Sequence, residues 1–145
     1  MMLATRQLCT FFLDGQLFGV DAQSVQEVIR YQVMTRVPKA PAAVSGLINL
    51  RGRIVTAIDL RVRLGIKSRD AGTLPMNVVV QCDDGTVSLL VDQIGDVIEV
   101  DAEHFETPPD TLQGPARELV KGAYKLNGRL LLLLDCDVAV RSISV

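Results

Sequence analysis

A repeat constrains this fold more than any other feature of the sequence. The segments VSGLINLRGRIVTAIDLRV (44–62) and VKGAYKLNGRLLLLLDCDV (120–138) align without gaps at an offset of 76 residues, with seven identical positions. In each copy two apolar runs flank a glycine, Gly52 or Gly128, that can take the positive φ of a tight hairpin turn. Asn127-Gly128 is the strongest short signal for such a hairpin. A unit this long that occurs only twice is no solenoid repeat, so two related β lobes are predicted.

Other turn and strand signals fit the same architecture. Hairpins are predicted around Asp14-Gly15 and Asp84-Gly85, and a weaker echo, which needs a gap, relates 17–29 to 88–100. The segment VQEVIRY (25–31) fits a strand or a helix, and the residues VMTRVP that follow it favour a strand. Four hairpins with little helical periodicity are typical of small β barrels.

Helices should be brief. One is predicted between Asp59, a suitable N-cap, and Gly65, which suits the position after the last turn. A further helical turn is predicted after Pro115. Residues 65–75, GIKSRDAGTLP, are the predicted linker between the lobes because turn-forming residues are concentrated there.

The composition supports one packed, all-β domain. Apolar residues make up 48% of the 145 residues, while Trp is absent and aromatics are 4%, so both lobes should share an aliphatic core. We predict a single domain over 1–145, with lobe one at roughly 15–70, lobe two at roughly 71–138 and an N-terminal strand that crosses between them.

The sequence favours a cytoplasmic protein that does not enter the membrane. The longest purely apolar run, Leu130 to Leu134, is far shorter than the roughly 20 residues of a spanning helix. The N-terminus lacks the apolar core and cleavage site of a signal peptide. Cys9, Cys82 and Cys136 are odd in number and lie in apolar runs, which predicts reduced thiols and neither disulfides nor a metal site.

Charge is unevenly distributed along the chain. Residues 1–69 carry ten Lys and Arg and four Asp and Glu, whereas residues 70–116 carry ten acidic residues and no Lys or Arg. Such a dipolar surface can steer and orient a protein partner. Nucleic acid favours one dominant basic face, so no nucleic-acid partner is expected, and an oligonucleotide-binding barrel is kept as a weaker alternative.

Catalytic and cofactor motifs are not found. The single histidine, His104, lies in a loop-like stretch without a second histidine or cysteine nearby, and no nucleophile elbow, phosphate loop or metal-ligand spacing occurs. Two joined β lobes leave a crease and free sheet edges, which suit protein partners. The sequence therefore predicts a binding module without cofactor or metal, and a small-ligand-binding or enzymatic β-protein remains the alternative.

The segments around the first hairpin resemble a known family. VSGLINLRGRIVTAIDLR, together with residues 11–41, 89–100 and 119–135, is similar to the CheW-like family of chemotaxis coupling proteins, over nearly the whole chain. The resemblance implies two five-stranded SH3-like barrels around a shared core and a non-catalytic scaffold. It also implies two partners: the regulatory domain of the histidine kinase CheA and the cytoplasmic tip of a chemoreceptor. The protein would be a monomer alone, form rings with CheA, and be recruited to membrane-bound receptor arrays.

The resemblance also implies a partner-binding set of five residues. Arg51 matches the hairpin-tip arginine of the family, Val25 and Glu27 match its first-lobe binding surface, Gly46 matches a glycine near the kinase contact, and Val97 matches an apolar groove position in the second lobe.

The repeat adds its own argument for Arg51. The equivalent of Arg51 is Asn127, an ordinary turn residue, whereas Arg53 is matched by Arg129. Arg51 thus departs from turn chemistry, and its planar guanidinium suits bidentate contact with a partner. Ser88 is a second departure, because the family usually has glycine there, which puts the packing of the second lobe in question.

Overall fold

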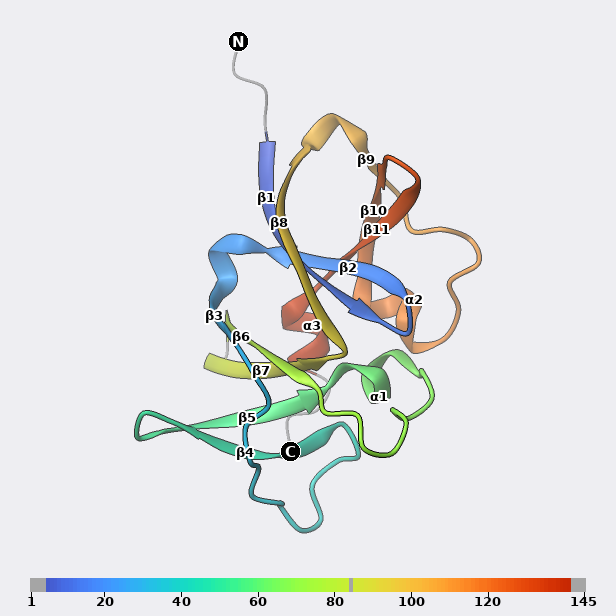
Figure 1. Ribbon diagram of the computed structural model, residues 1–145. Helices are drawn as coiled ribbons and strands as arrows, with labels where there is room; N and C mark the ends of the chain where they lie inside the picture. Colours follow the sequence, from blue (N-terminus) through green and yellow to red (C-terminus); the bar gives the residue numbers. More distant parts are fainter. Residues whose placement is uncertain (1–4, 84, 142–145) are drawn as a thin grey trace.

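The structure is a computed structural model that describes residues 5–83 and 85–141 (Figure 1). Two antiparallel-rich sheets form two β lobes that are stacked one above the other, with short helices at their junction. The fold is therefore mostly β, as predicted. We call the lower sheet in Figure 1 the first lobe and the upper sheet the second lobe.

The first lobe is a five-stranded sheet with the order β3-β6-β7-β5-β4. Its strands are β3 (Val25–Ile29), β4 (Val44–Leu50), β5 (Arg53–Asp59), β6 (Met76–Cys82) and β7 (Gly85–Val91). The second lobe has the order β8-β1-β2-β11-β10-β9, where the additional strand β9 is only two residues long. Its strands are β1 (Thr5–Leu13), β2 (Gln16–Asp21), β8 (Gln93–Asp101), β9 (Phe105–Glu106), β10 (Val120–Leu126) and β11 (Arg129–Leu134).

The four predicted hairpins are confirmed by antiparallel pairing of β1 with β2, β4 with β5, β6 with β7, and β10 with β11. The turn residue Asp84 lies outside the described residues, but Cys82 pairs with Gly85 across that turn. The ambiguous segment after Ser24 is a strand, β3, as predicted.

The short helices end where their sequences predict. In α1 (Leu60–Leu64) the Asp59 carboxylate accepts from the Arg61 N–H at 3.0 Å, and Gly65 follows with φ 73°. The predicted turn after Pro115 is α2 (Pro115–Leu119). Two 3₁₀ turns, η1 (Ala22–Ser24) and η2 (Ala102–His104), and a third helix, α3 (Cys136–Arg141), were not predicted.

The division of the chain between the lobes differs from the prediction of 15–70 and 71–138. β6 and β7 belong to the first lobe, and β2 belongs to the second. The reason is non-local pairing: β7 lies parallel to β5, and β11 lies parallel to β2. The chain therefore passes between the lobes twice, at η1 and at the β7–β8 junction.

Residues 65–75 consequently do not link the lobes. They join α1 to β6 within the first lobe, and they fold back on it. Arg61 donates to the Lys67 carbonyl at 2.8 Å, and Arg69 donates to the Leu90 carbonyl at 3.3 Å. Turn-rich composition identified a loop correctly, but the loop's partners are set by tertiary contacts.

One aliphatic core is shared by both lobes, as predicted. The largest buried cluster joins Phe11, Val20 and Leu132 of the second lobe to Ile58, Val78 and Leu89 of the first. Helices α1, α2 and α3 add Leu60, Leu119 and Ala139 to the same cluster. Of the three free cysteines, Cys82 is buried, and Cys9 and Cys136 are half-buried.

Ser88 lies in the first lobe, where its hydroxyl has a partner. It is fully buried on β7 and donates to Oδ1 of Asn77 on β6 at 2.7 Å. The Asn77 amide in turn donates to the Arg30 carbonyl at 3.1 Å, just beyond β3. The buried polar pair is thus satisfied, and it anchors the end of the edge strand β3. Ser88 therefore belongs to the first lobe and not to the second lobe, in which it was predicted.

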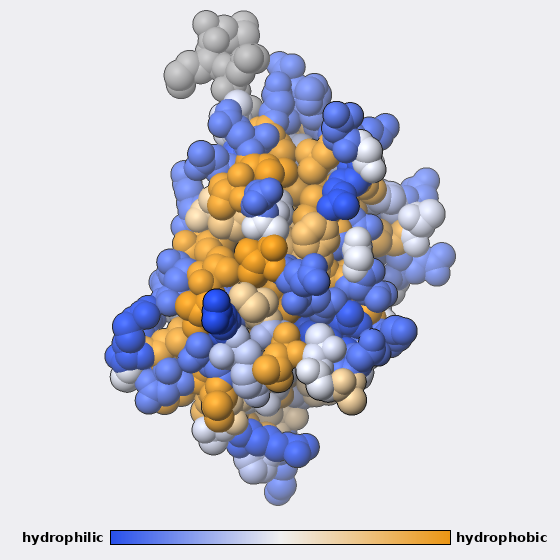
Figure 2. Space-filling view, in the orientation of Figure 1, coloured by the Kyte–Doolittle hydropathy of each residue, from blue (hydrophilic) through white to orange (hydrophobic). Residues whose placement is uncertain are grey.

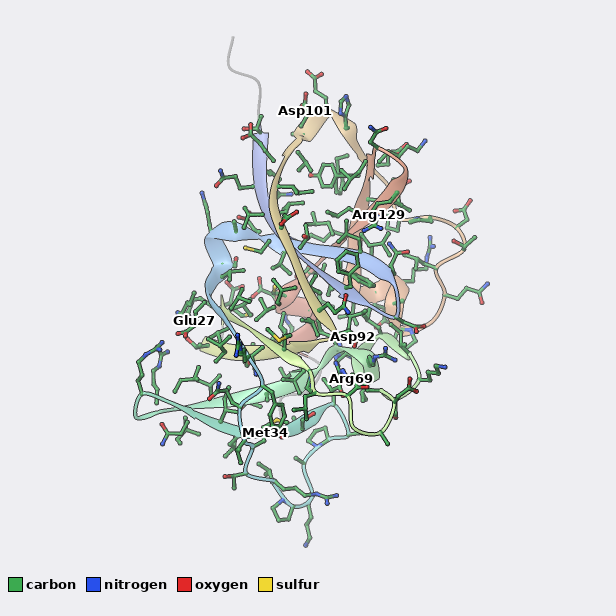
Figure 3. All side chains as sticks on the ribbon, in the orientation of Figure 1. Glu27, Met34, Arg69, Asp92, Asp101 and Arg129 are labelled. Atoms are coloured by element: carbon green, nitrogen blue, oxygen red, sulfur yellow. The ribbon has the colours of Figure 1, made fainter. Side chains whose placement is uncertain are left out.

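Charged residues tie the lobes together at the junction. Arg61 donates to both carboxylate oxygens of Asp92, at 2.9 and 2.6 Å. Arg69 donates to Asp92 and to Asp59, each at 3.0 Å, and Figure 3 shows Arg69 and Asp92 side by side. The backbone N–H of Asp14, in the β1–β2 turn of the second lobe, donates to Asp92 at 2.8 Å. We call these five residues the junction network.

The junction network is well shielded from solvent. The side chains of Arg61, Arg69 and Asp92 are 10%, 9% and 16% exposed. Burial alone raises the pKa of the Asp92 carboxyl, but hydrogen bonds from Arg61 and the Asp14 backbone, with the charges of both arginines, lower it overall. The hydrogen bond to Asp92 raises the pKa of Arg61. Asp92 is therefore the ionised centre on which both arginines converge.

Candidate partner-binding surface

Arg51 is held in an unusual backbone conformation at the tip of the β4–β5 hairpin. Leu50 pairs with Arg53, so the turn has two residues, Arg51 with φ 52° and Gly52 with φ 84°. Positive φ at both positions belongs to the type I′ turn, where Asn, Asp or Gly is favoured first. Positive φ among the described non-glycine residues is confined to Asp14, Lys39 and Arg51. The Asn49 side chain braces the turn by accepting from the Gly52 N–H at 2.9 Å.

Arg51 and Glu27 lie together, although 24 residues separate them in the sequence. The Arg51 guanidinium donates through Nη2 to Oε2 of Glu27, which stands on the edge strand β3. The Arg51 side chain is 75% exposed, whereas the Glu27 side chain is only 25% exposed. Beside this ion pair a small cavity of about 290 Å³ is lined by Leu50, Val55 and Val79, among others. Polar Gln26, Arg53 and Thr86 line the same cavity, so two of the five predicted site residues form one ion pair beside a mixed polar and apolar hollow.

Val25 and Val97 differ in exposure. Val25 begins β3, is half-buried and packs against the main core, so part of its role is structural. Val97 lies on β8, the edge strand of the other sheet, and is 61% exposed. Figure 2 shows apolar side chains gathered over β8 and the neighbouring strands on this face. Val28, on β3, is a further exposed apolar residue at 40%.

Gly46 has a backbone role. It is buried in a bulge of β4, and a Cβ atom there would lie 2.7 Å from the Thr35 carbonyl oxygen. The backbone N–H of Thr35 and that of Leu47 each donate to the other's carbonyl at 2.8 Å. The β3–β4 connection, which crosses β4 at Thr35, therefore needs this close approach. Gly46 therefore presents no side chain to a partner and instead positions the segment that crosses β4.

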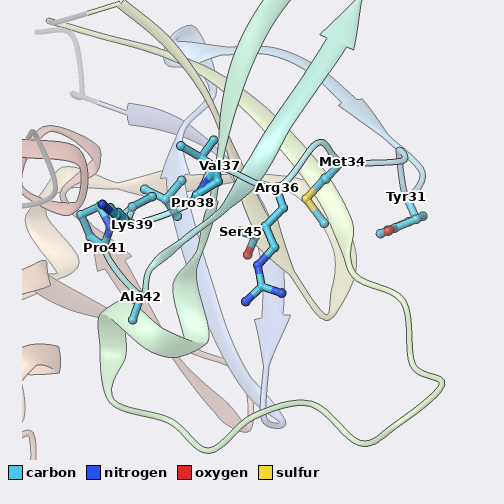
Figure 4. Close-up of a pocket in the computed structure, with 11 residues that line it drawn as sticks. Tyr31, Met34, Arg36, Val37, Pro38, Lys39, Pro41, Ala42 and Ser45 are labelled. Atoms are coloured by element: carbon cyan, nitrogen blue, oxygen red, sulfur yellow. The ribbon is translucent and has the colours of Figure 1, made fainter.

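That crossing segment forms a concavity that the sequence did not reveal. Residues of the β3–β4 connection, together with Val44 and Ser45 of β4, line a concavity of about 770 Å³ (Figure 4). Its wall combines apolar Met34 and Val37 with basic Arg36 and Lys39. Lys39, at φ 65°, is another residue in the left-handed region. The only available sequence signal was the spacing of Pro38 and Pro41 around it.

The rest of the described chain offers little for catalysis. His104 is exposed on η2, and no group of three His, Cys, Asp or Glu residues is arranged to hold a metal within 5–83 and 85–141. In the same residues, none of the helices is long and apolar enough to cross a membrane. The chemistry available at the Arg51 site is recognition by charge and shape.

Comparison with known proteins agrees with this geometry. The CheW-like domain model matches residues 7–144. The chain belongs to the CheW-like domain family. The Rhizobium meliloti chemotaxis protein CheW is 32% identical over 132 residues, which cover 91% of this chain and 85% of the relative. The Treponema pallidum chemotaxis protein CheW is 31% identical, covering 89% and 78%.

A solved CheW structure shares the fold. The scaffolding protein TtCheW from Thermoanaerobacter tengcongensis superposes with a TM-score of 0.83 at 28% identity, covering 94% of this chain and 92% of the other. The predicted family and the predicted two-lobed fold are therefore confirmed. CheW-like proteins are chemotaxis scaffolds, which points to an adaptor rather than an enzyme. The binding roles of Val25, Glu27, Gly46, Arg51 and Val97 stay predictions.

Proposed function

We propose that this protein couples chemoreceptors to a CheA-type histidine kinase as a non-catalytic scaffold. In this role it is cytoplasmic and is recruited to membrane-bound receptor arrays, where it alternates with the kinase in rings. Its partners are the regulatory domain of the kinase and the cytoplasmic tip of the receptor. Val25, Glu27, Arg51 and Val97 contact partners, and Gly46 shapes the surface beside them.

The proposal rests mainly on the backbone conformation and the exposure of Arg51. A solvent-exposed arginine occupies a left-handed turn position that Asn or Asp would occupy at lower cost. Such local strain is concentrated at functional sites in proteins. Its surroundings suit a partner as well, because an ion pair, a cavity with polar and apolar walls, and the edge strand β3 lie together.

The first test is binding to the regulatory domain of a CheA encoded in the same genome, measured by calorimetry. Arg51→Ala should weaken binding by about 1–3 kcal/mol, because a charge-assisted contact is lost and its acceptor is left unpaired. The variant's stability should stay within about 0.5 kcal/mol of the parent, since the Arg51 side chain, which forms one half of the ion pair with Glu27, is 75% exposed.

Arg129→Ala provides the matched control on the equivalent hairpin of the second lobe. Arg129 lies 5.2 Å from the centre of the Phe12 ring, so this variant loses about 0.5–1 kcal/mol of stability but should bind normally. Failure of the parent protein to bind any CheA of that genome would contradict the proposal. Steep salt-dependent binding of single-stranded nucleic acid, or turnover that depends on His104, would support the alternatives instead.

A further inference from the structure

Two thiols meet at the junction between the lobes. Cys82 ends β6 of the first lobe and is part of the main core cluster, and Cys136, which begins α3 at the end of the second, packs against that cluster. The next residues are hydrogen-bonded, because the Asp83 N–H donates to Oδ1 of Asp137 at 2.9 Å. Positions 54 residues apart in the sequence are thus held side by side by two adjacent contacts.

We propose that Cys82 and Cys136 are an oxidisable dithiol, and that hydroperoxides convert it into a disulfide bond that joins the two lobes. The site is separate from the surface around Arg51, and the proposal does not depend on the coupling function. The proposal limits the sequence-based prediction of reduced thiols to resting conditions. The thiols are reduced in the resting cytoplasm, and sustained exposure to peroxide joins them in a disulfide.

The two sulfurs differ in access to small molecules. Cys82 is 7% exposed and belongs to the main core. Cys136 is half-buried and lines a surface cleft of about 120 Å³, together with Arg6 and Lys121. A peroxide can therefore reach Cys136 first, and Cys82 lies behind it as the resolving thiol.

The chemistry proceeds in two balanced steps. The Cys136 sulfur attacks one oxygen of the peroxide, an S–O bond forms as the O–O bond breaks, and the thiol proton leaves with the departing oxygen as alcohol or water. The Cys82 sulfur then attacks the sulfenic acid on Cys136, the S–S bond forms as the S–O bond breaks, and water leaves with the Cys82 proton. The two thiols lose two electrons, which reduce the peroxide.

The surroundings make the first step slow at neutral pH. The hydrogen bond with Cys82, burial, and the charges of Asp137 and Asp135 all raise the pKa of the Cys136 thiol. Because the thiolate is the nucleophile, the oxidation rate should rise about tenfold for each pH unit between pH 7 and pH 9. The dithiol is thus protected from brief exposure to an oxidant.

Hydrogen peroxide treatment of the full chain at pH 7, 8 and 9 tests the proposal, followed by alkylation, intact mass and peptide mapping. We expect the loss of two hydrogen atoms, a peptide linking Cys82 to Cys136 and an alkylated Cys9. The melting temperature of the monomer should rise by several degrees, because the bridge restricts the unfolded chain. Cys9→Ala should behave like the parent protein.

Three results would overturn the proposal: separate oxidation of Cys82 and Cys136 to sulfinic acids in the parent chain, a bridge only between molecules, or a lower melting temperature after bridging. Cys82→Ala should leave Cys136 to progress to sulfinic acid without a bridge. Peptide mapping of the parent chain gives the decisive result even where this variant folds poorly.

Discussion

At the residue scale, Arg51 shows how far a sequence argument reaches. Its exposure at a hairpin tip follows from local turn chemistry, and the repeat marks it as the position where Asn127 stands in the other copy. Its partner Glu27 could not be predicted, because the contact joins strands that are distant in sequence. Its positive φ was not predicted either, because turn propensity favours Asn over Arg in that conformation, yet Arg51 adopts it and Asn127 is not among the described residues that do.

The conformation of Arg51 gives a test that separates stability from binding. Arg51→Asn should increase the free energy of unfolding by about 0.5 kcal/mol, because Asn tolerates positive φ and the exposed ion pair that is lost contributes less than about 1 kcal/mol. The same variant should bind the kinase regulatory domain as weakly as Arg51→Ala. Urea unfolding of both variants checks the order of stability, and an Asn variant no more stable than the Ala variant would mean that backbone strain is absent.

At the element scale, the hairpins were predictable because each is defined by residues adjacent in sequence. Helix α3 was missed, although the repeat contains the signal for it. Asp135 occupies the place of the helix cap Asp59, and its side chain accepts from the Val138 N–H at 3.2 Å. The apolar run before Asp135 indicates a strand, and no helix was predicted after it. Strand β9 was missed because two residues carry no periodicity.

The repeat also places equivalent glycines in equivalent strand bulges, which can be tested together. The register shifts at Gly46 in β4 and at Gly122 in β10, and a Cβ on Gly122 would lie 2.5 Å from the Glu106 carbonyl oxygen. Gly46→Ala and Gly122→Ala should each lower the free energy of unfolding by about 1–3 kcal/mol, because a neighbouring backbone must shift. Urea unfolding measures the loss.

Hydrogen exchange locates the damage in these variants. Gly46→Ala should speed exchange of the Thr35 and Leu47 amides, which bond to each other's carbonyls. Gly122→Ala should leave those two amides protected and expose the pairing of β9 with β10 instead. Ser45→Ala, next to Gly46 and half-buried, is the control and should change neither measurement. Normal protection of Thr35 in Gly46→Ala would show that the close approach is not required.

At the scale of the whole molecule, the sequence predicted two lobes and one core but divided the chain incorrectly between them. Lobe membership depends on two parallel pairings, β5 with β7 and β2 with β11, which join segments far apart in sequence. The result has a clear symmetry: each lobe contains a hairpin whose second strand is followed by a strand of the other lobe. The chain passes between the lobes twice, and both lobes contribute residues to one core, so neither lobe buries its apolar surface alone.

The junction network should make the stability of this two-lobed molecule sensitive to acid. Asp92 has a lowered pKa in the folded protein, so its contribution is complete above the ordinary aspartate pKa of about 3.9 and is lost as the pH falls through the folded value. Asp92→Asn removes the charge that Arg61 and Arg69 share, and it should lower the free energy of unfolding at pH 7 by about 3 kcal/mol.

Urea unfolding of the parent and Asp92→Asn at pH 7, 5, 4 and 3 measures how that difference changes. The difference should stay constant from pH 7 to pH 5 and shrink below about pH 4, because protonation then removes the same charge from the parent. Asp110→Asn, an exposed loop residue, is the control and should match the parent throughout. If the difference in free energy of unfolding is undiminished at pH 3, Asp92→Asn destabilises the protein through altered packing alone. The ionised carboxylate is then not what holds the two lobes together.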